Sequence, residues 1–586
     1  MAKKLPPVDV VLVGFGWTAA MLGLEFTNAG LKVLAIERGG WRDTSTDFAV
    51  TFAQDELRYY WRRALFEEPA RETLTFRNDP SQTALPMRHL GSFLPATGVG
   101  GAGVHWNGMT WRFLPSDFVA RSHNTQRYGA LPEDMTIQDW GVTYDELEPY
   151  YDKFEYLCGI SGKAGNLKGQ IQAGGNPFEG ARSRDYPNPP LTMVYGPTLF
   201  AQAASETGHK PFPGPAANMS RPYTNPLGVQ LGPCTYCGFC EKYGCGNYSK
   251  ASALTTVIPV LMRKKNFELR TECEVLTVNK DSAGKRATGV TYVDAQGEEF
   301  EQPAEIVILC AYATHNPRLM LLSGIGQPYD PRSGQGMLGK NYAYQITSSV
   351  NVFFDDKILN PFVGAGALGM VIDEYNGDNF DHSGLGFIGG GYVACWNTNG
   401  RPIETHPVPK DTPKWGSKWK AAVKKNYLTT ATIATHGAVM SHRNNYYDLD
   451  PTYRDVHGRP LLRLTFDFTD NEHKMSNYLT DRAADIAKAM KAREIHAKPR
   501  EGHYDIVPYQ TTHNTGGTIM GANPKSSVVN RYLQSWDLHN LFVMGASVFP
   551  QNAGYNPTGT IGALTYWAAN AIRTQYLKNP GPLVQA

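Results

Sequence analysis

The first forty residues alternate between apolar runs and a glycine-rich turn. Residues 8–13 are almost continuously apolar, which is typical of a parallel strand that is covered on both faces. Residues 18–28 follow a helical pattern that ends near Gly30, and residues 32–36 form a second apolar run that closes with Glu37. The pattern therefore predicts a strand–helix–strand unit at the start of the chain.

Later apolar periods predict elements that return to this unit. Strands are expected at residues 268–278, 287–294, 305–309 and 541–544, and helices at residues 471–491 and 558–575. Glycines crowd residues 90–108, which predicts an ordered loop whose backbone lies close to another group. Residues 211–232 are rich in proline, glycine and asparagine, so the cysteines that follow them should lie on irregular structure.

The turn after the first strand carries a dinucleotide-binding fingerprint. Gly14, Gly16 and Ala19 fit the G-x-G-x-x-[GA] pattern between a strand and a helix, where a pyrophosphate rests on the helix N-terminus. Glu37 is placed to accept hydrogen bonds from ribose hydroxyls, and a carboxylate there disfavours a 2′-phosphate. The expected ligand is FAD or NAD rather than NADP; the alternative is a chance glycine turn.

Composition narrows the classes of protein but does not choose a function. A chain of 586 residues with 41% hydrophobic and 19% charged residues is an ordinary globular protein of two to four units. A net charge of +2 disfavours binding to nucleic acid or to anionic lipid, and no apolar window is long enough to span a membrane. The apolar run after Lys3 and Lys4 is a buried strand rather than a signal peptide. Taken alone, this predicts a cytoplasmic protein or one exported by a signal on a partner.

Four cysteines lie within twelve residues. Cys234, Cys237, Cys240 and Cys245 include a ferredoxin-like x2, x2 spacing, which favours an iron-sulfur cluster. A four-thiolate zinc site is the stronger rival, and a disulfide framework is disfavoured in a chain that is otherwise poor in cysteine. The remaining thiols are dispersed and are interpreted as buried small hydrophobic groups: Cys158, Cys273, Cys310 and Cys395.

The second glycine loop carries a resemblance to a known family. Residues 98–108, residues 311–326, residues 445–451 and residues 556–560 resemble, in order, segments of the glucose-methanol-choline (GMC) oxidoreductase family. The resemblance spans nearly the whole chain. It implies that the cofactor is FAD rather than NAD. It implies that a further set of residues contacts the cofactor: Gly98, Gly100, Gly101, His105, Trp106, Asn107, Gly545 and Ala546.

The fold that the resemblance implies is α/β, or α+β overall. A Rossmann-like FAD-binding domain would be discontinuous, covering residues 1–150, 250–340 and 500–586. Residues 151–249 would form a loop-rich insertion with the cysteines, and residues 341–499 an interleaved substrate-binding domain of antiparallel sheet.

The reaction centre is also assigned by resemblance. Oxidation of a carbinol needs one base and one group that orients the hydroxyl beside the flavin. His513 resembles the family's catalytic histidine and Asn556 its His-or-Asn partner; the alternative for His513 is a structural hydrogen bond. His105-Trp106 resembles the pair that carries a histidyl bond to the flavin in pyranose oxidase, and otherwise His105 only bonds backbone. His436 and His442 either contact sugar hydroxyls or pack in the substrate domain.

Residues 232–240 resemble the flavoprotein large subunits of membrane-associated dehydrogenases that oxidise gluconate, 2-ketogluconate, sorbitol, fructose or glucose. The resemblance implies a 3Fe-4S cluster, oxidation of gluconate to 2-ketogluconate as the favoured reaction, and membrane contact only through partners. Those partners would be a small subunit with an export signal and a multihaem cytochrome c subunit, with quinone beyond, at the periplasmic face of the bacterial inner membrane. Two rivals stay open: an oxygen-using oxidase with a zinc site, and a flavoprotein without enzymatic activity.

Overall fold

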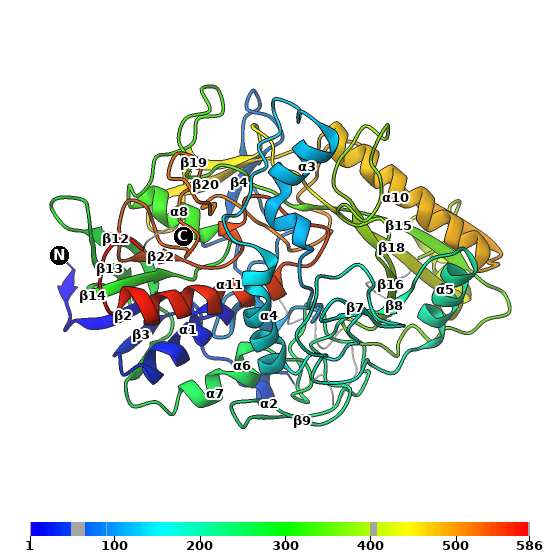
Figure 1. Ribbon diagram of the computed structural model, residues 1–586, viewed down its shortest axis with the longest axis horizontal. Coiled ribbons are helices and arrows are strands. Elements are labelled where there is room, and N and C mark those ends of the chain that lie inside the picture. Colours follow the sequence, from blue (N-terminus) through cyan, green and yellow to red (C-terminus); the bar gives the residue numbers. More distant parts are fainter. Residues whose placement is uncertain (1, 49–64, 90, 399–406, 584–586) are drawn as a thin grey trace.

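A computed structural model describes residues 2–48, 65–89, 91–398 and 407–583. Leu90, the first residue of the predicted glycine-rich loop, lies outside the described residues. Figure 1 shows two regions side by side, one built around the strands β2, β3 and β14 and the other around β15 and β18. The predicted mixture of α and β structure, with one dinucleotide-type region and one antiparallel region, is confirmed.

The first region is an eight-stranded sheet with a parallel centre. β2 (Val8–Val13) pairs in parallel with β3 (Val33–Ile36) and with β14 (Glu299–Leu309), and β22 (Leu541–Val543) extends this parallel part. The inner residues of β2 and all of β3 are buried, as the continuous apolar runs predict for a doubly covered sheet. α1 (Trp17–Asn28) and α11 (Thr558–Ala571) pack together beside it.

The prediction of a single strand at residues 268–278 is wrong. Residues 268–278 form two strands, β11 (Phe267–Arg270) and β12 (Glu274–Lys280), rather than one. β11 lies in parallel beside β3 at one end of the sheet, whereas β12 pairs with β13 (Ala287–Val293) at the other end. The backbone of Glu272 takes a φ of +55° between them, so the chain turns where the sequence has no glycine to mark it.

The second region is a six-stranded antiparallel sheet. β15 (Gln345–Phe353) and β18 (Thr430–Ala438) form its centre, with β17 (Gly391–Trp396), β16 (Gly369–Ile372) and β8 (Phe212–Pro213) on one side and β21 (Glu494–Lys498) on the other. α10 (Asp470–Ala489), drawn in gold in Figure 1, packs on one face of β15 and β18. Apolar and small residues such as Ile346, Val350 and Ile433 point to that face, which leaves the other face polar.

A third sheet connects the two regions. β19 (Tyr446–Arg454) and β20 (Pro460–Thr465) continue into β4 (Leu74–Arg77) and β5 (Leu85–Pro86), so segments nearly four hundred residues apart share one sheet. The remaining α-helices of the described ranges are α2 (Thr44–Asp47), α3 (Ala120–Tyr128), α4 (Tyr144–Cys158), α5 (Tyr195–Glu206), α6 (Ala253–Thr256), α7 (Ile258–Leu261), α8 (His315–Leu322) and α9 (Gly416–Asn426). Within the described ranges no helix combines the length and the apolar character that crossing a membrane requires.

Candidate active site

A large cavity of about 800 Å³ lies between the two sheets. One end is walled by the turn at Gly14 and Gly16, by the end of β3 and by Gly545 and Ala546 after β22. The other end is walled by the polar face of β15 and β18 together with His513 and Asn556. The fold thus joins the predicted dinucleotide fingerprint and the predicted reaction centre in one space.

The fingerprint end fits a bound pyrophosphate. Gly14 has a φ of +86° and a Cβ there would lie 2.8 Å from the Cys310 carbonyl oxygen, so only glycine is tolerated. A Cβ on Gly16 would have no neighbour closer than 3.7 Å, which leaves the backbone open toward the cavity. α1 begins directly after Gly16 without a capping side chain and without an acidic residue in its first turn. The first N–H groups of α1 therefore have no capping side chain, which suits the binding of an anion.

Glu37 closes this end, but its carboxylate is occupied by the protein. It accepts hydrogen bonds from the backbone N–H groups of Phe15 and Gly39, both at 2.8 Å, and of Gly98 at 3.2 Å. These bonds tie the first glycine turn to the second glycine loop. Glu37 also lines the cavity, so its contact with a ribose stays a prediction.

Most of the cofactor residues expected from the sequence reach the cavity wall. Gly98, Gly101, His105, Trp106 and Asn107 do so, whereas Ala19 and Gly100 lie behind the wall. Ala19 is fully buried in the first turn of α1, where a small side chain allows the helix to pack closely on the sheet.

His105 has the features that a covalent flavin ligand needs. Its side chain is buried, and its Nε2 atom has no hydrogen-bond partner among the described residues. Burial, assisted by the nearby Lys250 ammonium, lowers the pKa of His105 to about 3. The imidazole is therefore neutral at working pH, and it carries a buried, unpaired nitrogen on a residue that lines the cavity.

His513 and Asn556 lie together at the other end. Asn556 Nδ2 is 3.1 Å from His513 Nε2, although the two residues are 43 positions apart. The amide orientation of Asn556 is fixed because its Oδ1 accepts from Trp111 Nε1 at 3.0 Å and from the Tyr392 hydroxyl at 3.3 Å. The N–H of Asn556 therefore points at an unprotonated His513 Nε2.

Gln345 fixes the tautomer of His513, and sequence reasoning missed it. Its Nε2 donates to the carbonyl oxygens of Ala553 and Tyr555 at 2.6 and 2.7 Å, so its Oε1 must accept from His513 Nδ1–H. Burial, and secondarily the neighbouring His436, hold the pKa of His513 well below its usual range. His513 is thus neutral, and its unprotonated Nε2 accepts the hydrogen bond from Asn556. No local motif marks Gln345, which sits at the start of an ordinary strand.

The two histidines left open by the sequence have different surroundings. His436 lies 5.3 Å from His513 between ring centroids, lines the cavity and has a pKa lowered by burial to about 4. His442 instead lies 3.6 Å from Glu472, at the start of α10, and 3.6 Å from Asp134, in the segment after α3. His442 is therefore a structural residue, and only His436 is placed to meet a substrate.

The four cysteines lie on an irregular loop, as predicted, and all eight cysteines of the chain are free thiols. Backbone N–H groups approach the sulfurs: Tyr236 N lies 3.4 Å from Cys234 Sγ, and Lys250 N lies 3.4 Å from Cys245 Sγ. This cysteine loop, residues 234–245, touches the second glycine loop, residues 98–108, which is called the flavin loop below because it is expected to contact the flavin. The contact is direct, because Lys242 N donates to the His105 carbonyl oxygen at 2.7 Å. The dispersed thiols Cys158, Cys273, Cys310 and Cys395 are buried, as expected for small hydrophobic groups.

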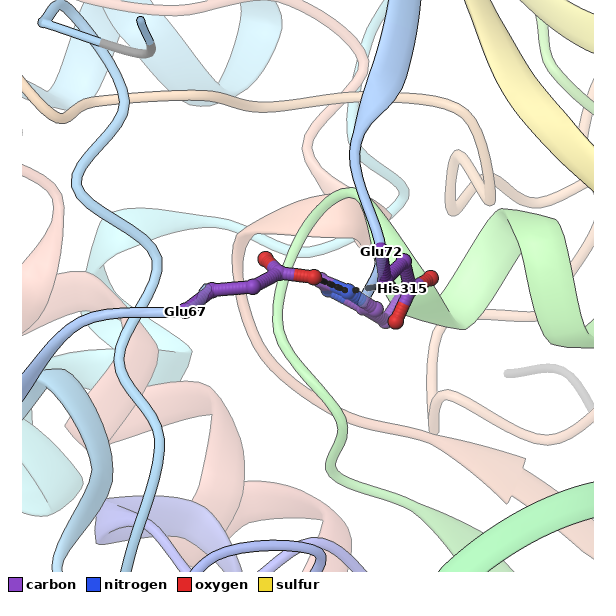
Figure 2. A group of neighbouring side chains, drawn as sticks. All are labelled: Glu67, Glu72 and His315. Atoms are coloured by element: carbon purple, nitrogen blue, oxygen red, sulfur yellow. Dashed lines mark ion pairs between the residues drawn. The ribbon is translucent and has the colours of Figure 1, made fainter. Parts of the chain in front are cut away.

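Glu67, Glu72 and His315 bring three ligand atoms within 4.8 Å of one another, which sequence reasoning missed. Figure 2 shows the imidazole between the two carboxylates. Arg38 Nη1 lies 2.7 Å from Glu72 and 3.3 Å from Glu67, and Arg318 also bonds Glu72. Although burial and Arg38 lower it, the two carboxylates raise the pKa of His315 to about 9. Arg38, Arg318 and the protonated His315 already balance the charge of the two carboxylates. The group is therefore an ion-pair network rather than a metal site.

Comparison with known proteins gives the family. Residues 217–347 and 441–565 match the two family models described as GMC oxidoreductase. The chain belongs to the GMC oxidoreductase family, and it is an FAD-dependent oxidoreductase that acts on CH–OH groups.

Among individual proteins, the chain is 51% identical to the gluconate 2-dehydrogenase flavoprotein of Pantoea cypripedii, over 100% of this chain and 97% of that protein. It is 25% identical to the fructose dehydrogenase large subunit of Gluconobacter japonicus, over 98% and 99% of the two chains. The crystal structure of pyridoxine 4-oxidase from Mesorbium loti shares the fold, with a TM-score of 0.57 at 15% identity, over 98% of this chain and all of that one.

Proposed function

We propose that this protein is the flavoprotein subunit of a dehydrogenase that oxidises a secondary alcohol of a sugar acid, with gluconate to 2-ketogluconate as the favoured reaction. The observation that carries the proposal is the polarity of the pair at the end of the cavity. His513 Nε2 accepts a hydrogen bond and Asn556 Nδ2 donates one, at a separation of 3.1 Å. An alcohol needs both, because its O–H donates while its oxygen accepts.

In the proposed reaction, the hydroxyl hydrogen and the carbon-bound hydrogen of the carbinol group leave to different acceptors. Asn556 holds the substrate oxygen, and His513 takes the hydroxyl proton on Nε2 as the C–O bond becomes a carbonyl. FAD, when bound, accepts the hydride from the same carbon. Gln345 stays bonded to Nδ1, so the imidazolium that forms has a fixed orientation.

A polyhydroxylated substrate suits the wall beyond this pair. The cavity face of β15 and β18 presents Thr347, Ser349, Thr432 and His436, with Lys498 at the edge strand. These side chains offer hydrogen bonds without a large apolar surface. The 51% identity to the Pantoea cypripedii protein favours gluconate, while 2-ketogluconate, sorbitol, fructose and glucose are the alternatives for the same chemistry.

We further propose that FAD is bound covalently through His105. The neutral imidazole and its unpaired Nε2 supply the nucleophilic nitrogen that such a bond requires. Phe66 packs edge-on against the ring at 4.6 Å between centroids, which restricts its rotation.

The cysteine loop is proposed to hold an iron-sulfur cluster, with 3Fe-4S favoured. Within the described part of the chain only the Glu67, Glu72 and His315 group places three ligand atoms within 4.8 Å. No three of the four sulfurs therefore lie within 4.8 Å of one another, whereas a single tetrahedral zinc ion with Zn–S bonds of about 2.3 Å would hold all four closer together. Cysteines of a cluster bind different iron atoms, and N–H bonds to sulfur tune such sites.

A cluster beside a flavin implies a one-electron acceptor outside this chain. We propose that electrons leave to a multihaem cytochrome c subunit and on to quinone, and that a small subunit supplies the export signal. The proposed location is the periplasmic face of the inner membrane, reached through these partners. Names of relatives that call them a flavoprotein or a large subunit support an assembly of several chains.

The test is an anaerobic visible spectrum of the purified protein before and after D-gluconate, with iron, zinc and acid-labile sulfide quantified on the same sample. Bleaching of the flavin together with iron and sulfide is the expected result. A matched His513→Asn variant should keep its flavin and fail to bleach. Zinc without sulfide, with rapid consumption of oxygen, would instead establish the oxidase alternative, and no bleaching by any sugar acid or polyol would refute the proposed reaction.

A further inference from the structure

A buried lysine joins the flavin loop to the cysteine loop. The Nζ atom of Lys250 donates to the carbonyl oxygens of Trp106 at 2.6 Å, of Cys240 at 2.6 Å and of Tyr243 at 2.8 Å. Trp106 follows the proposed flavin ligand His105, and the other two carbonyls belong to the cysteine loop. Lys250 is only 1% exposed. One ammonium group therefore satisfies all three of its hydrogens while it ties two loops together.

The charge of Lys250 has no carboxylate to balance it. Within the described ranges no acidic side chain is recorded at ion-pair distance from Lys250, and Glu241, a nearby acidic residue, acts on it less strongly than the thiols of the cysteine loop. Three carbonyl dipoles satisfy hydrogen bonds but do not neutralise a full charge, and an unpaired buried cation is costly. The thiols Cys240, Cys245 and Cys237 also act on Lys250 and favour its charged form. Thiols bound to a metal cluster are anionic, so an occupied cysteine site supplies the missing negative charge.

We infer that Lys250 is a positioning residue for electron transfer: it holds the cysteine loop against the flavin loop, and its charge raises the reduction potential of the group that the cysteines bind. The inference rests on the proposed function, because it presumes that the cysteines hold an iron-sulfur cluster. A buried cation that bonds the backbone carbonyl oxygens of Cys240 and Tyr243 stabilises the state of a nearby cluster with one more electron. Electrons from the flavin would then move toward the cluster rather than remain on the flavin.

The same contacts hold the flavin loop and the cysteine loop together, which keeps the path for electron transfer between them short. The Lys250 side chain bonds the Trp106 carbonyl oxygen, and the Trp106 indole Nε1 bonds the Ala251 carbonyl oxygen at 2.8 Å. Trp106 is thus tied to Lys250 and Ala251 by two hydrogen bonds, one accepted by its carbonyl oxygen and one donated by its indole. Asn218 adds a bond from its Nδ2 to Cys240 Sγ at 3.6 Å on the other side. Loss of Lys250 removes the charge and one of these ties but leaves all four cysteines in place.

The test compares the wild-type holoenzyme with Lys250→Met, which keeps the length of the side chain and removes its charge. Iron and sulfide are quantified, and the midpoint potential of the cluster is measured by redox titration followed by electron paramagnetic resonance. We expect the midpoint potential of the cluster to fall by at least 59 mV. For a one-electron couple, this shift corresponds to a tenfold change in the ratio of reduced to oxidised cluster. Reoxidation of the flavin by the cluster should slow at least tenfold relative to the rate at which gluconate bleaches the flavin in the same variant.

Lys250→Arg is the matched control, since it keeps the positive charge, and its potential should stay near that of the wild type. If Lys250→Met does not yield folded protein with a cluster, Lys250→Gln, which retains donors for two of the carbonyls, is measured in its place with the same expected shift. A charge-removing variant with full iron and sulfide and an unchanged midpoint potential overturns the inference. A wild-type protein without iron and sulfide overturns the proposed cluster itself, which distinguishes the two failures.

Discussion

The role of Gln345 gives a prediction that separates positioning from general packing. Its amide hydrogens are committed to the carbonyl oxygens of Ala553 and Tyr555, so its oxygen selects the His513 tautomer with the proton on Nδ1. Gln345→Leu removes that acceptor at similar volume. Nothing then holds the proton on Nδ1, and part of the population carries it on Nε2, where His513 cannot act as a base.

The size of the effect follows from one neutral hydrogen bond. Such a bond contributes about 0.5–1.5 kcal/mol net, and about 1.4 kcal/mol corresponds to a factor of ten. We therefore expect kcat/KM of Gln345→Leu for gluconate to fall roughly tenfold. This is well below the roughly 10²- to 10⁴-fold loss expected when the base itself is removed.

The assay is steady-state oxidation of gluconate with an artificial electron acceptor across a range of pH, with flavin content measured in parallel. Gln345→Glu is the informative partner, because it keeps the acceptor but adds a negative charge beside His513. That charge raises the pKa of His513, so protonation removes the base at higher pH and the acid limb of kcat/KM moves upward. Unchanged kcat/KM in Gln345→Leu, or an acid limb that stays in place in Gln345→Glu, would refute the assigned tautomer.

The remaining predictions concern the base, the flavin bond and stability. His513→Asn should lower kcat/KM by roughly 10²- to 10⁴-fold with flavin content unchanged, as measured by steady-state kinetics and absorbance. His105→Ala should release its flavin on acid precipitation, whereas the wild type should retain it; release from both would contradict the covalent bond. Glu72→Gln leaves buried cations uncompensated and should lower the free energy of unfolding by about 3 kcal/mol in urea, while the exposed Glu133→Gln should change it little. Burial lowers the pKa of His436 from 6.5 to about 4, so the unfolded chain takes up a proton that the folded chain does not. Stability should therefore fall as pH drops from 6.5 toward 4, by about 3 kcal/mol from this one group, and His436→Gln should lose less over that range.

Local patterns determined the elements that a short stretch of chain can specify. The strand–helix–strand unit of residues 8–37 was predictable because doubly covered strands are continuously apolar and because the glycine turn allows a backbone that other residues avoid. α10 was predictable from its long helical period, and its observed bounds are Asp470–Ala489. The resemblance of short motifs supplied the names of His513 and Asn556, and the family itself is confirmed.

What only the tertiary structure decided is how distant residues act on one another. The single strand predicted at residues 268–278 breaks in two because β3 and β13, which lie at different places in the sheet, each take one part. Gln345, Trp111 and Tyr392 lie 168, 445 and 164 positions from the groups they orient, so no local spacing could reveal them. The cysteines could be found by their spacing, but the proximity of their loop to His105 could not. The sequence by itself therefore determined which chemical groups are present, and long-range packing decided which nitrogen is free, which charge is buried and which loops touch.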